Sequence, residues 1–439
     1  MIPLSPLAFV HDLRWEDIPS RVQDRIGLHL LDLLGIAAGG AALRSSQIAR
    51  KFALAEQPGN LPLLFDGCGA SASGVAFAAA TGIDALDGHD GYNPAKGHIG
   101  CPLFSALLPI AQEQGASGRA FLTALVMGYE FGARAAEAQH GTVTDYHTSG
   151  SWGAVTGAAG CARLLGFDLE TTRHALGIAE YYGPRSQMMR CIDHPTMVKD
   201  GSGWGAMTAV SAARLASAGF TGAPAITVEE APDYWTDLGS RWATLEQYFK
   251  PYPVCRWAQA PIEGVLALRR KHDLTSDLVA RIEVETFHES VRLATRRPCS
   301  TDEAQYSTAF PCAIALLRGA VTAADIADDA LADPELLRLA DGMVFAENAH
   351  ANSLFPRKRI AKVSLVMKDG RRLEGEWLEP RWDHNAPPTE AELRAKYHSL
   401  AAPALGGDRA SRIEAAVDAL PRSGFAELQE LVSAPAHSS

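Results

Sequence analysis

The sequence lacks the short motifs that mark several large enzyme classes. It has no G-x-S-x-G, no H-E-x-x-H and no P-loop, and none of its seven cysteines forms a C-x-x-C pair. These absences count against a serine hydrolase, a zinc protease, a P-loop nucleotide-binding protein and an iron–sulfur protein. An odd, scattered set of cysteines also predicts reduced thiols and no disulfide framework.

Positive charge and long apolar runs are scarce too. The chain has 40 Lys and Arg against 51 Asp and Glu, which gives a formal net charge of -11. Nucleic acids and anionic membranes require a basic face, so we expect neither as a partner, whereas a small anionic substrate could still meet a local arginine cluster. The most apolar stretch, residues 30 to 43, is too short to span a bilayer, and no signal peptide is evident. We therefore expect a cytoplasmic protein.

The composition is that of a globular protein with a large core. The chain has 439 residues, of which 47% are hydrophobic and 21% charged, and this length predicts two domains. From Ile18 to Ile36, apolar residues recur at the helical period, and similar patterns with short Gly or Pro breaks continue to about residue 219. The sequence predicts a large all-α domain over residues 1–265.

The pattern changes after about residue 265. The stretch RIEVETF, residues 281 to 287, alternates like a half-buried strand, and residues 360 to 377 resemble a hairpin with an Asp-Gly turn. Helical patterns at 308 to 319 and 322 to 342 lie between them. We predict a mainly α protein in which a smaller α+β domain, residues 266–390, interrupts the helical domain and residues 391–439 dock back on it.

Titratable residues crowd into one Gly-rich stretch, DALDGHDGYNPAKGHIGCP at residues 84 to 102. Asp87 and His98 lie eleven residues apart across this turn, so the carboxylate could orient or polarise an imidazole that works as acid or base. A solvated loop or a pair of helix caps is the alternative. Metal binding by His89, Asp90 and His98 is disfavoured because no helical ligand spacing is present. We interpret His89, Asp90 and Lys96 as ordinary loop residues.

Two further polar stretches open predicted helices. Tyr146 and His147 precede a helix that Ser149 or Ser151 could cap. Lys199 precedes the helix entry GSGWG, where it could act as a base or remain a surface charge.

A third stretch, KPYPVCRWAQ, carries two prolines that fix an extended segment. Its side chains Lys250, Arg256 and Gln259 would point in set directions. Arg256 could clamp a carboxylate bidentately or form a surface salt bridge.

Taken in order, eight stretches resemble one family. They are IP-x-x-V…LLDLLG, GIDALD, SGRAFLTALVMGYE, SWGAVTGAAGCARLLG, HALGIAEYYG, KPYPVCR, DEAQYSTAFP and PPTEAELRAKY. Together they cover most of the chain and resemble the MmgE/PrpD superfamily, which includes 2-methylcitrate dehydratase, cis-aconitate decarboxylase and iminodisuccinate epimerase. The resemblance implies a homodimer and a site under a lid domain that needs no cofactor or metal. It also implies active-site roles for Asp87, His98, His147 and Lys199.

Two positions depart from the family pattern. Gln259 stands where the decarboxylase and dehydratase branches usually carry a His, and the family's Tyr falls on Phe310, one turn after Tyr306. Neither Gln nor Phe exchanges a proton near neutral pH. Epimerisation needs only proton removal from one face of a carbon and delivery to the other. We therefore predict a cofactor-independent isomerase that epimerises a carbon α to a carboxylate in a small dicarboxylate or amino-dicarboxylate such as iminodisuccinate.

In this interpretation Lys199 and either Tyr146 or His147 are the two bases, while Asp87 and His98 orient or polarise them. The residues expected to hold the substrate are Arg185, Arg190, Lys250, Arg256 and Gln259. Two alternatives remain. The first is a lyase, either a dehydratase of a 2-methylcitrate-like substrate or a cis-aconitate-type decarboxylase, in which His147 and His98 replace the missing groups. The second is a helical binding or scaffold protein without activity.

Overall fold

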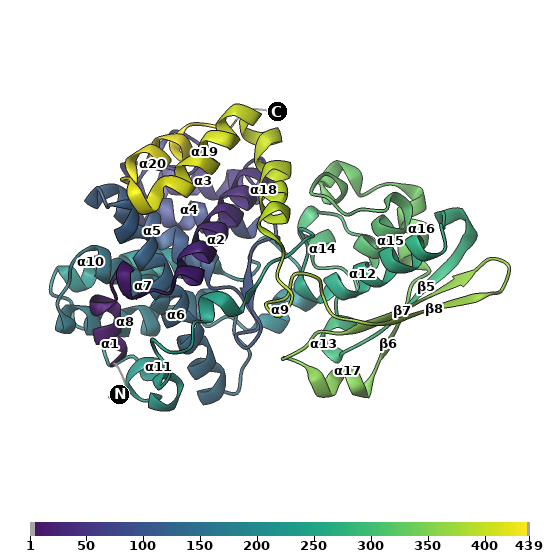
Figure 1. The fold of residues 1–439 in the computed structure, drawn as a ribbon, viewed down its shortest axis with the longest axis horizontal. Helices are drawn as coiled ribbons and strands as arrows, with labels where there is room; N and C mark the ends of the chain where they lie inside the picture. Colours follow the sequence, from purple (N-terminus) through teal and green to yellow (C-terminus); the bar gives the residue numbers. More distant parts are fainter. Residues whose placement is uncertain (1–4, 437–439) are drawn as a thin grey trace.

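The computed structural model describes residues 5–436 and contains two domains (Figure 1). The larger domain is helical and confirms the mainly α fold. Its N-terminal helices are α1 (Pro6–Asp12), α2 (Ser20–Gly39), α3 (Arg44–Glu56), α4 (Ala72–Asp84), α5 (Gly100–Gln114), α6 (Gly118–Thr142), α7 (Gly150–Leu164), α8 (Leu169–Tyr182), α9 (Met188–Asp193), α10 (Ser202–Ser217) and α11 (Ile226–Glu229). Among the described residues no single helix is long and apolar enough to cross a membrane; α2 and α3 reach that length only together, across a bend of 93°.

Small residues let the central helices approach closely. A Cβ at Gly157 of α7 would lie 2.7 Å from the Ala209 Cβ of α10 and 2.9 Å from the Ala106 Cβ of α5. A side chain at this position would separate three helices, so α7 forms the centre of the domain. The buried core runs through these helices, which gives the loops at their ends a rigid base.

Both ends of the chain build the helical domain, as predicted. Helix α18 (Glu390–Leu405) packs on α2 and is followed by α19 (Gly407–Ala419) and α20 (Ala426–Ser433) (Figure 1). A Cβ at Gly35 of α2 would lie 3.2 Å from the Cα of Tyr397, so the two backbones are nearly in contact. The Lys396 ammonium group also donates to Asp32 Oδ1 over 2.6 Å, which fixes α18 along α2.

The smaller domain contains one sheet with strand order β6-β5-β7-β8. Strand β5 (Val279–Thr286) pairs parallel with β6 (Val344–Glu347) and antiparallel with β7 (Ala361–Met367), which forms a hairpin with β8 (Arg372–Leu378). The predicted strand and hairpin are confirmed, and Gly370 adopts the positive φ of 88° that its turn needs. The helices are α12 (Arg256–Lys271), α13 (His288–Val291), α14 (Thr301–Gln305), α15 (Ala309–Arg318), α16 (Pro334–Asp341) and α17 (Ala349–Leu354).

Two details of the small domain differ from expectation. Residues 322 to 342 form one helix only at α16, because short 3-10 turns occupy the stretch before Pro334. Helix α12 crosses the expected boundary at residue 265 and packs on β7, where a Cβ at Gly264 would lie 2.5 Å from Val363 Cγ2. The unit around the sheet therefore begins at Arg256.

Four short strands within the helical domain were not expected. Strand β1 (Pro58–Pro62) pairs with β2 (Gly69–Ala70), and β3 (Gly91–Tyr92) pairs antiparallel with β4 (Gln247–Tyr248). They are too short for a periodic pattern to reveal. The β3–β4 pair matters for function because it joins the Gly-rich loop to the proline-rich segment that follows β4.

Candidate active site

The Gly-rich loop between α4 and α5 is held in place by the β3–β4 pair. Gly91 lies opposite Tyr248, so the chain beyond β4 runs back along the loop. As a result the Lys250 ammonium group forms a buried ion pair with the Asp87 carboxylate and donates to the Asp87 carbonyl oxygen over 3.2 Å. Burial favours the neutral acid, but Lys250 and the neighbouring histidines outweigh it and hold the pKa of Asp87 below its ordinary value.

His98 is oriented by the same loop. Its Nδ1 faces the Asp90 carbonyl oxygen, which only accepts, so Nδ1 carries the hydrogen and Nε2 keeps a free lone pair in the neutral ring. Nε2 lies 3.5 Å from Asp200 Oδ2 and 3.9 Å from Asp87 Oδ1. Burial, with the nearby His89 and Lys250, lowers the pKa of His98 to about 3. At neutral pH this imidazole is therefore uncharged and can accept a proton.

Asp200 faces His98 from the turn before α10. Ser149 links the two: its hydroxyl accepts from the His98 backbone N–H over 2.9 Å and donates to Asp200 Oδ1 over 3.2 Å. Ser149 thus does not cap α7 with its side chain, contrary to one of the expected arrangements. Burial, together with Asp84 and Asp87, raises the pKa of Asp200 to about 7. This carboxyl group can hold a proton at neutral pH, and sequence reasoning missed it.

A buried network supports the imidazole from behind. The Asp90 carboxylate accepts from the Tyr129 hydroxyl over 2.6 Å and lies 2.9 Å from His29 Nδ1. His89 stands beside His98, with ring centroids 4.2 Å apart, and its Nε2 lies 3.2 Å from Asp84 Oδ1. The interpretation of His89 and Asp90 as ordinary loop residues is therefore wrong, since both pack around the His98 ring.

These groups meet at a narrow cavity of about 20 Å³ between the two domains. Its lining residues are Asp87, Lys96, His98, Tyr146, Met188, Asp200, Tyr248, Lys250, Cys255, Arg256, Trp257, Tyr306 and Arg359. The helical domain contributes the acid and base side chains, and the small domain contributes Arg256, Tyr306 and Arg359. The structure thus brings together five of the predicted residues: Asp87, His98, Tyr146, Lys250 and Arg256.

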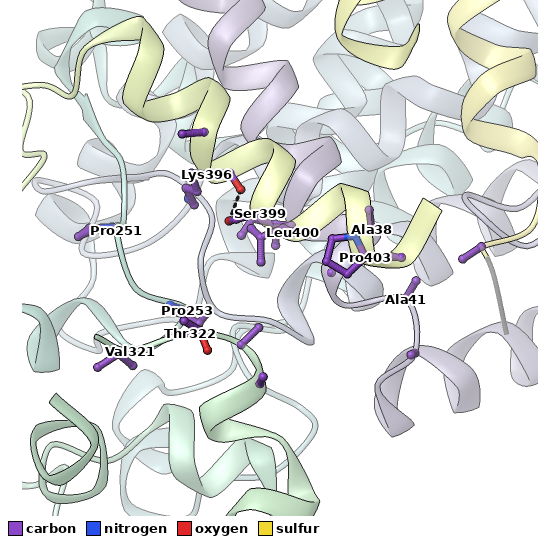
Figure 2. A pocket seen from close by; sticks show the side chains of 18 of the residues that line it. Ala38, Ala41, Pro251, Pro253, Val321, Thr322, Lys396, Ser399, Leu400 and Pro403 are labelled. Atoms are coloured by element: carbon purple, nitrogen blue, oxygen red, sulfur yellow. Dashed lines mark hydrogen bonds between the residues drawn. The ribbon is translucent and has the colours of Figure 1, made fainter. Parts of the chain in front are cut away.

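A larger hollow of about 620 Å³ opens at the joint between α2, α18 and the small domain (Figure 2). Its walls are mainly alanine and proline side chains, and the only titratable residues among those that line it are Glu392 and Lys396. Lys396 is already bonded to Asp32 and to the Gly88 carbonyl oxygen. Glu392 in turn accepts hydrogen bonds from Thr389 at the start of α18. Both titratable residues of this hollow are thus already bonded, so the smaller cavity is the candidate active site.

Lys199 and His147 lie close to the cavity but do not line it. The Lys199 ammonium group donates to Gln305 Oε1 over 2.6 Å and lies 3.2 Å from Asp302 Oδ1, so its hydrogens already have acceptors. His147 Nδ1 faces the Asp145 carbonyl oxygen at 2.9 Å. Of the two residues proposed as the base opposite Lys199, only Tyr146 reaches the cavity, and its hydroxyl donates to the Lys96 carbonyl oxygen.

Three expected substrate contacts are absent. Arg185 and Arg190 are exposed and do not line the cavity, so the structure does not place them against a substrate there. Gln259 is fully buried, and its amide donates to the Tyr252 and Val254 carbonyl oxygens at 2.9 and 3.0 Å. Gln259 therefore braces the proline-rich segment from within and does not face the substrate.

Tyr306 lines the cavity together with Tyr146 and Tyr248, whereas Phe310 does not. Phe310, which the family pattern aligned with a tyrosine, lies fully buried in the main core. Tyr306 lines the cavity, and burial with the surrounding carboxylates raises the pKa of its hydroxyl. Its neighbour Gln305 accepts from the Asp87 backbone N–H over 2.8 Å and from Lys199, which ties α14 to the Gly-rich loop.

Two side-chain groups among the described residues come close enough to hold a metal ion: Asp84, His89 and Cys101, and Asp87, His89 and His98. Their ligand atoms lie within 4.8 Å of one another. In the second group the Lys250 ammonium group already neutralises Asp87, so a cation would have to displace it.

Comparison with known proteins agrees with this architecture. The model of the MmgE/PrpD N-terminal domain matches residues 7–237, and that of the C-terminal domain matches residues 252–422. The chain belongs to the MmgE/PrpD family. A cis-aconitate decarboxylase of Aspergillus terreus is 26% identical over 477 aligned residues, which cover 97% of this chain and 95% of that protein. A cis-aconitate decarboxylase-like protein of Aspergillus oryzae is 24% identical, with 97% and 96% covered.

Membership in the MmgE/PrpD family supports an enzyme, and the relatives named above are a cis-aconitate decarboxylase and a cis-aconitate decarboxylase-like protein. Gln259 and Phe310, the two departures from the family pattern that favoured an epimerase, no longer support that reaction once their positions are known. Gln259 and Phe310 do not line the cavity, whereas Tyr306 does. The side chains at those two positions therefore cannot decide which reaction the cavity performs.

Proposed function

We propose that this MmgE/PrpD protein is a cofactor-independent lyase of small polycarboxylates, with decarboxylation of a cis-aconitate-like substrate as its reaction. The observation that carries the proposal is the pair formed by His98 and Asp200 at one end of a cavity that also contains Lys250 and Arg256. A lyase needs a proton donor next to a carbanion, and cationic groups next to its carboxylates. The relatives named above support the same class of substrate.

The proton balance of a decarboxylation fits the two partners. The bond between the substrate carbon and one carboxylate breaks, carbon dioxide leaves, and the electron pair on carbon takes up one proton. Asp200 is the group that holds a proton near neutral pH, because burial and two neighbouring carboxylates oppose its ionisation. His98, uncharged and with Nε2 facing Asp200, accepts or relays a proton between turnovers.

Charge that develops in the transition state is met by cations from both sides. Lys250 is fixed by Asp87, and Arg256 stacks on the Tyr248 ring with its guanidinium carbon 3.9 Å from the ring centroid. Since these groups are buried and held by the protein, they need little reorganisation to stabilise an enolate-like intermediate.

The proposal is tested by incubating the purified protein with cis-aconitate in deuterated water. We expect release of carbon dioxide and an unsaturated dicarboxylate that carries one deuterium per turnover. His98→Gln should abolish both signals, and Arg185→Gln, at an exposed position outside the cavity, serves as the matched control.

Other products would overturn the decarboxylase. Hydration, or loss of water from a 2-methylcitrate-like acid, would point to the dehydratase reaction. Exchange of a substrate α-hydrogen with inversion, and with neither carbon dioxide nor water released, would favour the epimerase that the sequence predicted.

A further inference from the structure

Arg359 is a buried cation without an acidic partner. Only 3% of the residue is exposed, and its guanidinium group donates to neutral oxygens: the Asn93 side chain and, over 2.8 Å, the Pro356 carbonyl. Within residues 5–436 no acidic side chain pairs with it, and its Nε has no hydrogen-bond partner. A buried guanidinium without a counter-ion is costly, so this arrangement calls for an anion in the cavity that Arg359 lines.

The other charges around the cavity do not supply that anion. Asp87 neutralises Lys250, and Asp383 lies 2.5 Å from Arg256 Nη2. The Asn93 amide also donates to Asp383 over 3.0 Å. The Asp383 carboxylate therefore contacts Arg256 and Asn93, and only Asn93 contacts Arg359. With a pKa raised to about 7, Asp200 carries its proton about half of the time at neutral pH and adds less than a full negative charge.

Lys96 is a second cation without a carboxylate in contact, although the charge of Glu289 acts on it from farther away. Its ammonium group lies 4.2 Å from the centroid of the Tyr146 ring and, in the described part of the chain, pairs with no carboxylate. Lys96 was interpreted from the sequence as an ordinary loop residue, but its side chain lines the cavity. Arg359 and Lys96 together leave two positive charges on the cavity wall.

From this geometry we infer that Arg359 and Lys96 form a carboxylate-binding subsite that selects substrates with carboxylates beyond the reacting one, so that a tricarboxylate is preferred over a dicarboxylate. The inference rests on the proposed function for the identity of the reacting end. Its physical basis is separate, since it concerns binding alone. Arg359 lines the cavity, and its buried Nε has no hydrogen-bond partner, so the guanidinium group retains a donor for a carboxylate oxygen.

The test measures binding of unreactive probes by calorimetry. Purified protein is titrated with 1,2,3-propanetricarboxylate and with glutarate, and we expect the tricarboxylate to bind at least about tenfold more tightly. Arg359→Gln should weaken tricarboxylate binding by about tenfold to a hundredfold and reduce the preference over glutarate to about twofold. Arg357→Gln, an exposed position in the same loop, is the matched control and should keep the wild-type preference.

An unchanged preference in Arg359→Gln would overturn the subsite. If that variant does not fold, as judged by circular dichroism, Arg359→Lys keeps the charge but removes the Nε donor. It should weaken tricarboxylate binding by about threefold to tenfold, and affinity equal to that of the wild type would again overturn the subsite.

The two proposals can fail separately. If the protein decarboxylates cis-aconitate but its preference for the tricarboxylate is the same in Arg359→Gln, the lyase proposal is supported and the subsite proposal is contradicted. If the preference depends on Arg359 but no decarboxylation is measured, the subsite proposal is supported and the lyase proposal is contradicted.

Discussion

The two walls of the cavity differ in how their charges are satisfied. On the helical-domain wall, each catalytic candidate has a titratable neighbour: His98 faces Asp200, and Asp87 faces Lys250. On the small-domain wall, Arg359 is buried with neutral partners only. The helical-domain wall is arranged to move protons, and Arg359 of the small-domain wall, together with Lys96 of the Gly-rich loop, is arranged to receive an anion.

This difference indicates which side chains take part in proton transfer and which side chains select the substrate. The helical wall is built on the rigid core of α4, α5, α7 and α10, which holds acid and base within hydrogen-bonding reach. The small-domain wall comes from α12, α14 and the loop before β7. Mutations on the first wall should lower kcat, and mutations on the second should change KM and substrate preference.

The largest expected effect comes from removing the acid of the helical wall. Asp200→Asn keeps the size of the side chain but cannot supply a proton, so kcat should fall by about a hundredfold to ten-thousandfold while tricarboxylate binding persists. Because the native carboxyl group is buried beside Asp84 and Asp87, the variant should also be more stable than the wild type at pH 8. Rate assays and thermal unfolding measure the two effects.

Asp145→Asn, an acidic position outside the cavity, is the control for both measurements. A variant at Asp200 with nearly wild-type kcat would show that the proton comes from another group, and Tyr306 would be the next candidate.

The next effect is a pH profile that Asp200 sets. With a pKa of about 7, this carboxyl group loses its proton above neutrality, so kcat/KM should fall about tenfold per pH unit there. His98, with a pKa of about 3, should leave the profile flat from about pH 5 to pH 6.5. A rate that instead rises through pH 7 would mean that the ionised form of Asp200 is the active one.

The free energy of unfolding should depend on the protonation of Asp200 between the pKa of this group in the unfolded chain and its pKa in the folded protein. The folded protein keeps the Asp200 proton up to about pH 7, whereas the unfolded chain releases it near the ordinary value of 3.8. Between these values the folded state binds more protons, so the Asp200 contribution to stability decreases as pH rises through this window. Subtracting the Asp200→Asn unfolding curve from that of the wild type isolates this contribution.

The sequence predicted the fold well because the fold depends on local periodicity. The helices, the strand at 281 to 287 and the Asp-Gly hairpin follow from patterns within one element, and the helical domain built from both ends of the chain follows from the order of these elements. The β3–β4 pair could not be predicted in this way, because two residues in each strand are too few to show a periodic pattern of apolar and polar residues. That pair is the contact that places Lys250 on Asp87.

The site was predicted only in part for a similar reason. Asp87 and His98 lie in a visibly unusual loop, which made them candidates, and the family resemblance implied their active-site roles. Asp200 and Arg359 carry no motif; their importance comes from burial and from the identity of their neighbours, which arise only in the folded chain. A lysine next to Asp200 drew attention in the sequence, yet the aspartate reaches the cavity and Lys199 does not.

The smallest expected effect tests the residue that favoured an epimerase. Gln259→His restores the family's histidine, but the side chain is buried with its amide donating to the Tyr252 and Val254 carbonyl oxygens. An imidazole replaces at most one of these hydrogen bonds, so the variant should lose about 1–3 kcal/mol of stability and keep its reaction type. We expect kcat within about threefold of the wild type, because the cavity wall is otherwise unchanged. A new product from Gln259→His, measured on the same panel of substrates, would return that position to the active site and show that the helical wall alone does not determine the chemistry.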